Sequence, residues 1–159
     1  MSIDRIPLAH HEGSLWLCGL RDVSDDPAAV LSYTGAATIV CLNELSELER
    51  RAPAYLDWLR ANQPGRALWF PTRNFHAESA DATLPLLEMV VERLDTGVVM
   101  HCAMGQGRAG TMAVCLLMMT GAPLDDALCT VAAHRPFAGP GEGSQWALVD
   151  DVARALGRS

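Results

Sequence analysis

Short apolar runs alternate along the chain with longer stretches in which apolar residues recur every three or four positions. The short runs predict buried strands, because they are brief, nearly uninterrupted and bounded by Gly or Pro; they cover residues 15–18, 37–42, 67–70 and 97–101. The longer stretches predict helices. A short one begins near Pro27, and the others cover 45–59, 81–94, 111–120, 124–134 and 144–156; the helix over 111–120 is apolar. We therefore predict one α/β domain over residues 1–159, in which a mainly parallel sheet of about four to five strands has helices on both faces.

The composition narrows the class of partner. Half of the 159 residues are apolar and 19% are charged, which is typical of a globular domain. Acidic residues outnumber basic ones by 19 to 12 and give a net charge of −7, so we expect no nucleic-acid partner. No apolar run is long enough to cross a membrane, so we expect no membrane partner either. The sequence does not predict an oligomeric state.

The cysteines indicate a reducing compartment. There are five of them, odd in number and widely spaced: Cys18, Cys41, Cys102, Cys115 and Cys129. This pattern predicts free thiols and a cytoplasmic location, not a disulfide framework. One alternative stays open, because Cys41 ends the second strand and a protective disulfide to Cys102 is conceivable there. Neither Cys-x-x-Cys nor His-x-x-x-His spacing occurs, so we expect no metal site.

The loop from His101 to Thr111 carries the candidate chemistry. It follows a buried strand and opens a helix, which places it where α/β sheets bind ligands. The N–H groups at a helix N-terminus bind anions, and the glycines let successive N–H groups point inward. Arg108 adds a planar, two-pronged donor suited to phosphate. These positive surroundings favour the ionised, nucleophilic form of Cys102, so one loop can hold an oxyanion and attack it.

The loop resembles a known signature. A Cys is followed by five residues and an Arg, with His before the Cys and Gly third after it, as in the cysteine-dependent protein tyrosine and dual-specificity phosphatases. Four further segments are similar to the small atypical dual-specificity branch: residues 16–19, 40–45 and 70–75, and Arg135-Pro136 followed by Gln145. The resemblance covers residues 13–155. It implies the fold of the dual-specificity phosphatases and a phosphatase activity that needs no cofactor. The implied substrate is a phosphorylated protein or a small aryl phosphate.

The same resemblance implies a role for each loop residue. Cys102 becomes the nucleophile that forms a phosphocysteine, and Arg108 binds the phosphoryl oxygens. Backbone N–H groups complete the phosphate site, from Ala103, Met104, Gly105, Gln106, Gly107 and Arg108. His101 helps to hold the thiolate, and Gln145 positions water. Because the side chains in the loop are uncharged apart from Arg108, a highly phosphorylated lipid is disfavoured as substrate.

Two departures from the family pattern predict a slow enzyme. Asn74 stands where the general-acid Asp is expected, and Ala109 replaces the hydroxyl residue that follows the Arg. Positioned acid–base catalysis contributes roughly 10²–10⁴-fold, so its loss is costly unless a neighbour substitutes. The candidate substitutes are Glu78, His76 and Asp81, although we expect Asp81 mainly to cap the next helix. An aryl phosphate is favoured over an alkyl one, because phenolate leaves with less need for an acid.

Competing functions remain open. The main alternative is a catalytically impaired module that binds phosphorylated protein without hydrolysing it, for which Asn74 and Ala109 argue. A sulfurtransferase of the thiosulfate type also uses a Cys in a cradle loop, but the Gly-x-x-Arg spacing speaks against it. The run 105–110 matches Gly-x-Gly-x-x-Gly of dinucleotide sites, yet too little chain follows for that fold. A thiol protease pair of Cys102 with His134 leaves Arg108 without a role.

Overall fold

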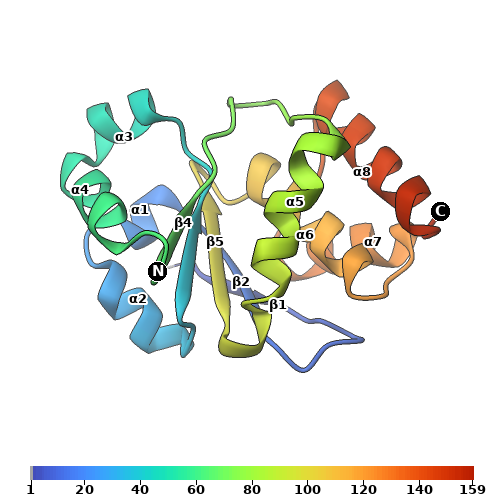
Figure 1. Cartoon of the computed structure of the whole chain (residues 1–159), viewed down its shortest axis with the longest axis horizontal. Coiled ribbons are helices and arrows are strands. Elements are labelled where there is room, and N and C mark those ends of the chain that lie inside the picture. The colour runs from blue at the N-terminus through green and yellow to red at the C-terminus, as the bar shows by residue number, and fades with distance from the viewer. Residues whose placement is uncertain (1) are drawn as a thin grey trace.

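The computed structural model describes residues 2–159 and contains one five-stranded sheet in the order β1-β2-β5-β3-β4 (Figure 1). The strands are β1 (Asp4–Ile6), β2 (Leu15–Gly19), β3 (Thr38–Cys41), β4 (Ala67–Trp69) and β5 (Val98–Cys102). Strands β2, β5, β3 and β4 run parallel, and only the edge strand β1 pairs antiparallel. The predicted α/β class with a mainly parallel sheet is confirmed.

Helices cover both faces of the sheet. The elements are α1 (Leu20–Val23), α2 (Pro27–Thr34), α3 (Leu45–Arg51), α4 (Pro53–Asn62), α5 (Ala80–Val91), α6 (Gly107–Met119), α7 (Leu124–His134) and α8 (Gly143–Leu156), with a short 3₁₀ turn at Leu94–Thr96. Helices α1–α4 pack on one face and α5–α8 on the other, each layer closing its own apolar core (Figure 1). Within residues 2–159 no helix is both long and apolar enough to cross a bilayer.

Three predicted boundaries were wrong, each for a local reason. The edge strand β1 was missed because three residues carry too little periodicity. The helix predicted at 45–59 is two helices, since Pro53 lacks an N–H and keeps Ala52 out of the helical conformation (φ −153°). The helix predicted from Thr111 begins at Gly107, so Arg108 lies in its first turn.

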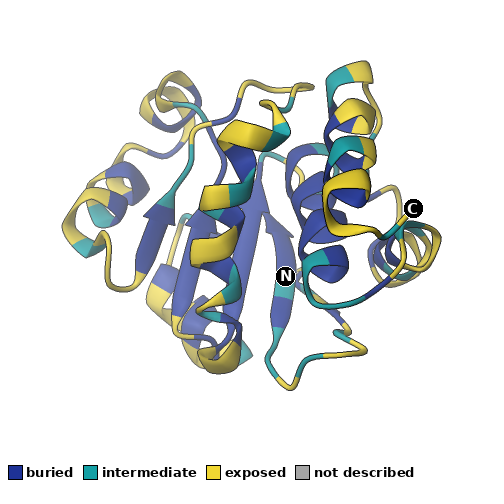
Figure 2. Ribbon diagram, turned by 45° about the vertical axis from the view of Figure 1, so that its right-hand side comes forward, coloured by how far each residue is buried: buried dark blue, intermediate teal, exposed yellow. Residues whose placement is uncertain are grey.

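Helix α6 lies at the centre of its layer. Residues 108–118 are all buried, which explains why the segment is apolar on every side from Met112 on (Figure 2). Gly110 allows the closest approach to it, because a Cβ there would lie 2.2 Å from the backbone nitrogen of Gly139. The segment before α8 is therefore packed directly against the start of α6, where the candidate loop lies.

Candidate active site

The central strand β5 ends at Cys102, and the loop that follows leads directly into α6. The Cys102 side chain lines a cavity of about 270 Å³ at the carboxyl edge of the sheet. Most of the residues that the sequence singled out line the same cavity: Asn74, Ala103, Met104, Gln106, Gly107, Arg108 and Gln145. Gly105 and His101 do not line it; both are buried behind its wall.

Arg135 braces the loop from outside the cavity. Its Nη2 and Nε atoms donate to the carbonyl oxygens of Met104 (2.7 Å) and Gly105 (2.8 Å), and its Nη1 pairs with Asp4 at 2.8 Å. Arg135 is buried as well as ion-paired, and the sequence did not predict its contacts with the loop. Gly105 has φ +70°, and a Cβ on it would lie 2.3 Å from the Cys18 carbonyl oxygen, so only glycine fits there.

The carbonyl oxygens of residues 103–106 all accept hydrogen bonds from groups outside the loop. The carbonyl oxygen of Ala103 accepts from Leu20 N (3.1 Å), and that of Gln106 accepts from Gly139 N (3.1 Å). Within residues 2–159, no acceptor is bonded to the backbone N–H groups of residues 103–108. A ring of unpaired N–H groups at a helix N-terminus is a binding site for an oxyanion.

The Arg108 guanidinium is held so that one edge stays available. Nη1 donates to Glu47 Oε2 (2.7 Å) and to the Thr72 carbonyl oxygen (2.9 Å), and Nη2 donates to Glu47 Oε1 (2.8 Å). The guanidinium has five N–H donors. The Nε–H has no partner although it is buried, and one Nη2 hydrogen is also left. These two donors share one edge, which is the geometry that binds two phosphoryl oxygens at once.

Glu47 is the partner that the sequence analysis missed. It lies in α3, on the opposite helical layer, and is buried. Burial alone raises the pKa of its carboxyl, but the hydrogen bonds from Arg108 and from Glu44 N outweigh burial and lower the pKa from 4.5 to about 2. Glu47 is therefore ionised at neutral pH. The only signal in the sequence is its place shortly after a strand end, which does not distinguish it from its surface neighbours.

His101 supports the loop from below as a neutral ring. Burial lowers the pKa of His101 to about 4. Its Nδ1 lies 3.4 Å from the Cys102 carbonyl oxygen, and its Nε2 lies 2.6 Å from the Tyr55 hydroxyl. A carbonyl oxygen only accepts, so the proton is on Nδ1 and Nε2 accepts from Tyr55. His101 thus fixes the backbone at Cys102. Neither hydrogen bond of its ring reaches the Cys102 thiol, which we expected it to hold.

The segment 71–79 closes one side of the cavity. Asn74 and Phe75 line the cavity, and Asn74 Oδ1 accepts from Phe75 N at 3.1 Å. Phe75 has φ +65°, a strained conformation for a bulky side chain. The segment is tied to α8 where the Ala77 N–H donates to Ser144 Oγ at 3.0 Å. The amide of Asn74 therefore occupies the place predicted for the general acid.

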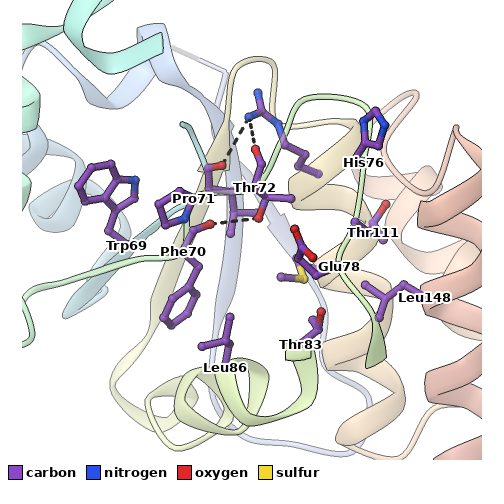
Figure 3. A pocket seen from close by; sticks show the side chains of 14 residues that line it. Trp69, Phe70, Pro71, Thr72, His76, Glu78, Thr83, Leu86, Thr111 and Leu148 are labelled. Carbon is purple, nitrogen blue, oxygen red and sulfur yellow. Dashed lines mark hydrogen bonds between the residues drawn. The ribbon is translucent and has the colours of Figure 1, made fainter. Parts of the chain in front are cut away.

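The candidate substitutes for the acid lie elsewhere. Glu78 and His76 line a second cavity of about 290 Å³, into which Glu78 points (Figure 3). That cavity is largely apolar, with Trp69, Leu86 and Leu148 among its walls. Asp81 lines neither cavity. It does not cap α5 either: Ser79 does, accepting from Ala82 N at 3.3 Å, and Asp81 sits in the first turn.

Three of the other cysteines are kept as thiols by burial. Burial raises the pKa of Cys18, Cys41 and Cys115 to about 12. All five cysteines are free, including Cys41 and Cys102. Cys41 belongs to the core under α1–α4, whereas Cys102 belongs to the core under α5–α8. The disulfide that we considered between them is not formed. Within the same part of the chain, residues 2–159, no cluster of three potential metal ligands occurs.

The comparison with family models agrees with this geometry. The model of "PTP-SAK: Swiss Army Knife protein, DSP-PTPase phosphatase domain" matches residues 14–146. The chain belongs to this family. It is a phosphatase domain of the dual-specificity and protein tyrosine phosphatase type, and the resemblance to the atypical dual-specificity branch is confirmed. No curated protein matches the sequence.

Solved structures share the fold across the whole chain. Kinase associated phosphatase (KAP) has a TM-score of 0.79 at 18% identity, with 100% of this chain and 97% of that one covered. Tk-PTP in its active form has a TM-score of 0.70 at 23% identity, covering 94% and 96%. The human tyrosine phosphatase-like serine/threonine/tyrosine-interacting protein has a TM-score of 0.72 at 19% identity, covering 98% and 95%. At these identities the likeness establishes the fold alone.

Proposed function

We propose that the protein hydrolyses phosphate monoesters through a phosphocysteine on Cys102. The observation that carries this proposal is a set of unpaired donors on the residues of one cavity. Cys102 and most of the loop up to Arg108 line this cavity, while the N–H groups of residues 103–108 and one edge of the Arg108 guanidinium have no partner in the described chain. Donors fixed before the substrate arrives stabilise charge that develops on a phosphoryl group, at no cost of reorganisation. Neither a metal ion nor a cofactor is needed for this chemistry.

In the first step the Cys102 thiolate attacks the phosphorus atom. The S–P bond forms as the ester P–O bond breaks, and the electron pair leaves with the alcohol oxygen. The three equatorial oxygens lie against the loop N–H groups and Arg108 during this transfer. Glu47 keeps the Arg108 guanidinium oriented, because its carboxylate binds Nη1 and Nη2 on the edge that does not face the phosphoryl group. In the second step water cleaves the S–P bond and releases inorganic phosphate.

The rim of the cavity supports an aryl phosphate as substrate. Three large apolar side chains line the cavity yet remain open to solvent: Phe75 is 62% exposed, Met104 63% and Phe137 87%. Both phenylalanines have positive φ, +65° and +67°, so strained backbone presents them at this rim. An aromatic leaving group packs against such side chains. Because Asn74 cannot protonate the leaving oxygen, a phenolate is also the leaving group that the site tolerates best.

Phosphorylated tyrosine in a protein is the natural form of such a group. We therefore propose phosphotyrosine-containing protein as the substrate class, ahead of phosphoserine or phosphothreonine. The second candidate function is binding of phosphorylated protein without turnover, and the presence of an amide at position 74 favours it. Both functions use the same anion site, so they differ only in whether the phosphoryl group moves to sulfur.

Release of inorganic phosphate from an aryl phosphate tests the proposal. We expect the unaltered protein to release phosphate in amounts exceeding one per molecule, and the Cys102→Ser variant to release none while still binding vanadate. If the unaltered protein binds vanadate but releases no phosphate from aryl phosphates or phosphotyrosine peptides, the binding function is the correct one.

A further inference from the structure

The second step of the proposed reaction needs a base that the sequence analysis did not find. Water attacks phosphorus well only when a base takes its proton. Asn74 is an amide and cannot do so, and Ala109 offers no hydroxyl to the leaving sulfur. Glu78 and His76 line the neighbouring cavity together with Thr83 and Leu148 (Figure 3).

Glu142 is the one carboxylate that lines the Cys102 cavity within residues 2–159, and no histidine lines it. Glu142 is the N-cap residue of α8, where it forms a reciprocal capping box with Gln145, and it is exposed. No arginine or histidine of the described chain forms an ion pair with it. A glutamate that is open to solvent and has no cationic partner is available to take a proton from a water molecule.

The backbone around Glu142 is fixed relative to the anion site. Gly139 N donates to the Gln106 carbonyl oxygen at 3.1 Å, and the close packing of Gly139 on Gly110 joins this segment to α6. The N–H groups of Gly141 (2.9 Å) and Glu142 (3.3 Å) both donate to Gln145 Oε1 in the first turn of α8. The position of Glu142 is thus set by the same loop and helix that hold the phosphate.

Gln145 lies between Glu142 and the loop. Its side chain is 1% exposed, and its Nε2 lies 3.4 Å from the point that a Cβ on Gly107 would occupy. Since Oε1 is taken by the backbone of the 141–142 segment, the orientation of the amide is set and Nε2 is the atom turned to the loop. An N–H donor beside the phosphate, together with a carboxylate on the same rim, is an arrangement that can bind one water molecule.

We propose that Glu142 is the general base that hydrolyses the phosphocysteine, a role that rests on the proposed function. Glu142 takes a proton from the water that Gln145 orients. The water oxygen forms a bond to phosphorus, the S–P bond breaks, and its electron pair returns to Cys102 as thiolate. The products are hydrogen phosphate and the free enzyme, and Glu142 then gives its proton to solvent.

Rapid mixing with p-nitrophenyl phosphate tests this assignment. In Glu142→Gln we expect a burst of nitrophenol close to one equivalent per enzyme, at the rate of the unaltered protein. A steady rate at least roughly 10-fold lower follows, because only the second step loses its base. The phosphoenzyme should then dominate the intact-mass spectrum. The steady rate of Glu142→Asp should exceed that of Glu142→Gln, because Asp keeps the carboxylate. If Glu142 had only a structural role, the isosteric Gln variant would keep the higher rate.

Glu88→Gln is the matched control, because Glu88 is an exposed carboxylate on α5 that lines neither cavity; we expect it to behave as the unaltered protein. The assignment is overturned if Glu142→Gln keeps the full steady rate, or if burst and steady rates fall together. Vanadate binding shows whether the variant retains the anion site, and Glu142→Asp provides the answer if Glu142→Gln does not fold. If the unaltered protein itself forms neither nitrophenol nor phosphoenzyme, the proposed function fails, which is a different result.

Discussion

Replacing Glu47 with Gln tests how the phosphate-binding arginine is held. The change leaves one oxygen acceptor at position 47 but removes the charge opposite Arg108, which is 3% exposed. Breaking a buried ion pair by removing one partner costs about 3–5 kcal/mol. The pKa gives a similar figure: a fall from 4.5 to about 2 corresponds to roughly 3 kcal/mol at 1.36 kcal/mol per pKa unit. We therefore expect the free energy of unfolding to fall by about 3 kcal/mol at pH 7.

The pH dependence has a definite sign. The pKa of Glu47 is lower in the folded state than in the unfolded state, so its contribution is complete above about pH 5 and is lost as the pH falls toward 2. The difference in stability between the unaltered protein and Glu47→Gln should therefore shrink steadily from pH 6 to pH 3, by more than half if the low pKa is correct.

Urea unfolding measured at several pH values checks both statements. Glu49→Gln serves as the control, because Glu49 is exposed on the same helix and makes no recorded ion pair. A loss below about 1 kcal/mol at pH 7, the value typical of a surface pair, would refute the reasoning. A difference that does not change with pH would refute the assigned ionisation of Glu47.

Three further predictions concern the reaction. Arg108→Lys should weaken vanadate binding by roughly 10-fold or more in a titration, because an ammonium keeps the charge but loses the two-donor edge. Asn74→Asp should raise the rate on alkyl phosphates more than on aryl phosphates, by up to ~10²-fold, since an acid helps poor leaving groups most; equal gains would contradict this. Phe137→Ala should lower kcat/KM for an aryl phosphate by roughly 5-fold, which corresponds to about 1 kcal/mol, and leave an alkyl phosphate nearly unchanged.

The fold was largely predictable because its signals are local. Each buried strand of four or more residues has a continuous apolar run, and α6 is apolar from Met112 to Met119 because it is enclosed on all sides. The edge strand β1 and the break at Ala52 were not predicted. A three-residue strand has almost no pattern, and Pro53 fits the first turn of a new helix as readily as it ends an old one.

From the residues themselves the site was predictable only where they are consecutive, and Asn74 and Gln145 were added by the family resemblance. The loop from Cys102 to Arg108 is contiguous in the sequence, so its donors could be read directly. Glu47, Tyr55 and Arg135 reach the loop from three other segments, and their roles follow from tertiary packing alone. The ion pair between Arg108 and Glu47 could not be predicted from any pattern in the sequence, and neither could the place of Glu142 at the cavity.

Trapping the phosphoenzyme tests the central claim most directly. The protein is mixed with p-nitrophenyl phosphate, quenched with acid within one turnover, digested and mapped by mass spectrometry, with Glu142→Gln included to lengthen the life of the intermediate. The account predicts one phosphoryl group on the peptide that contains Cys102, and none on the peptides that contain Cys18, Cys41, Cys115 or Cys129. Turnover with an unmodified Cys102 peptide in both proteins, or a phosphoryl group on another residue, would contradict it.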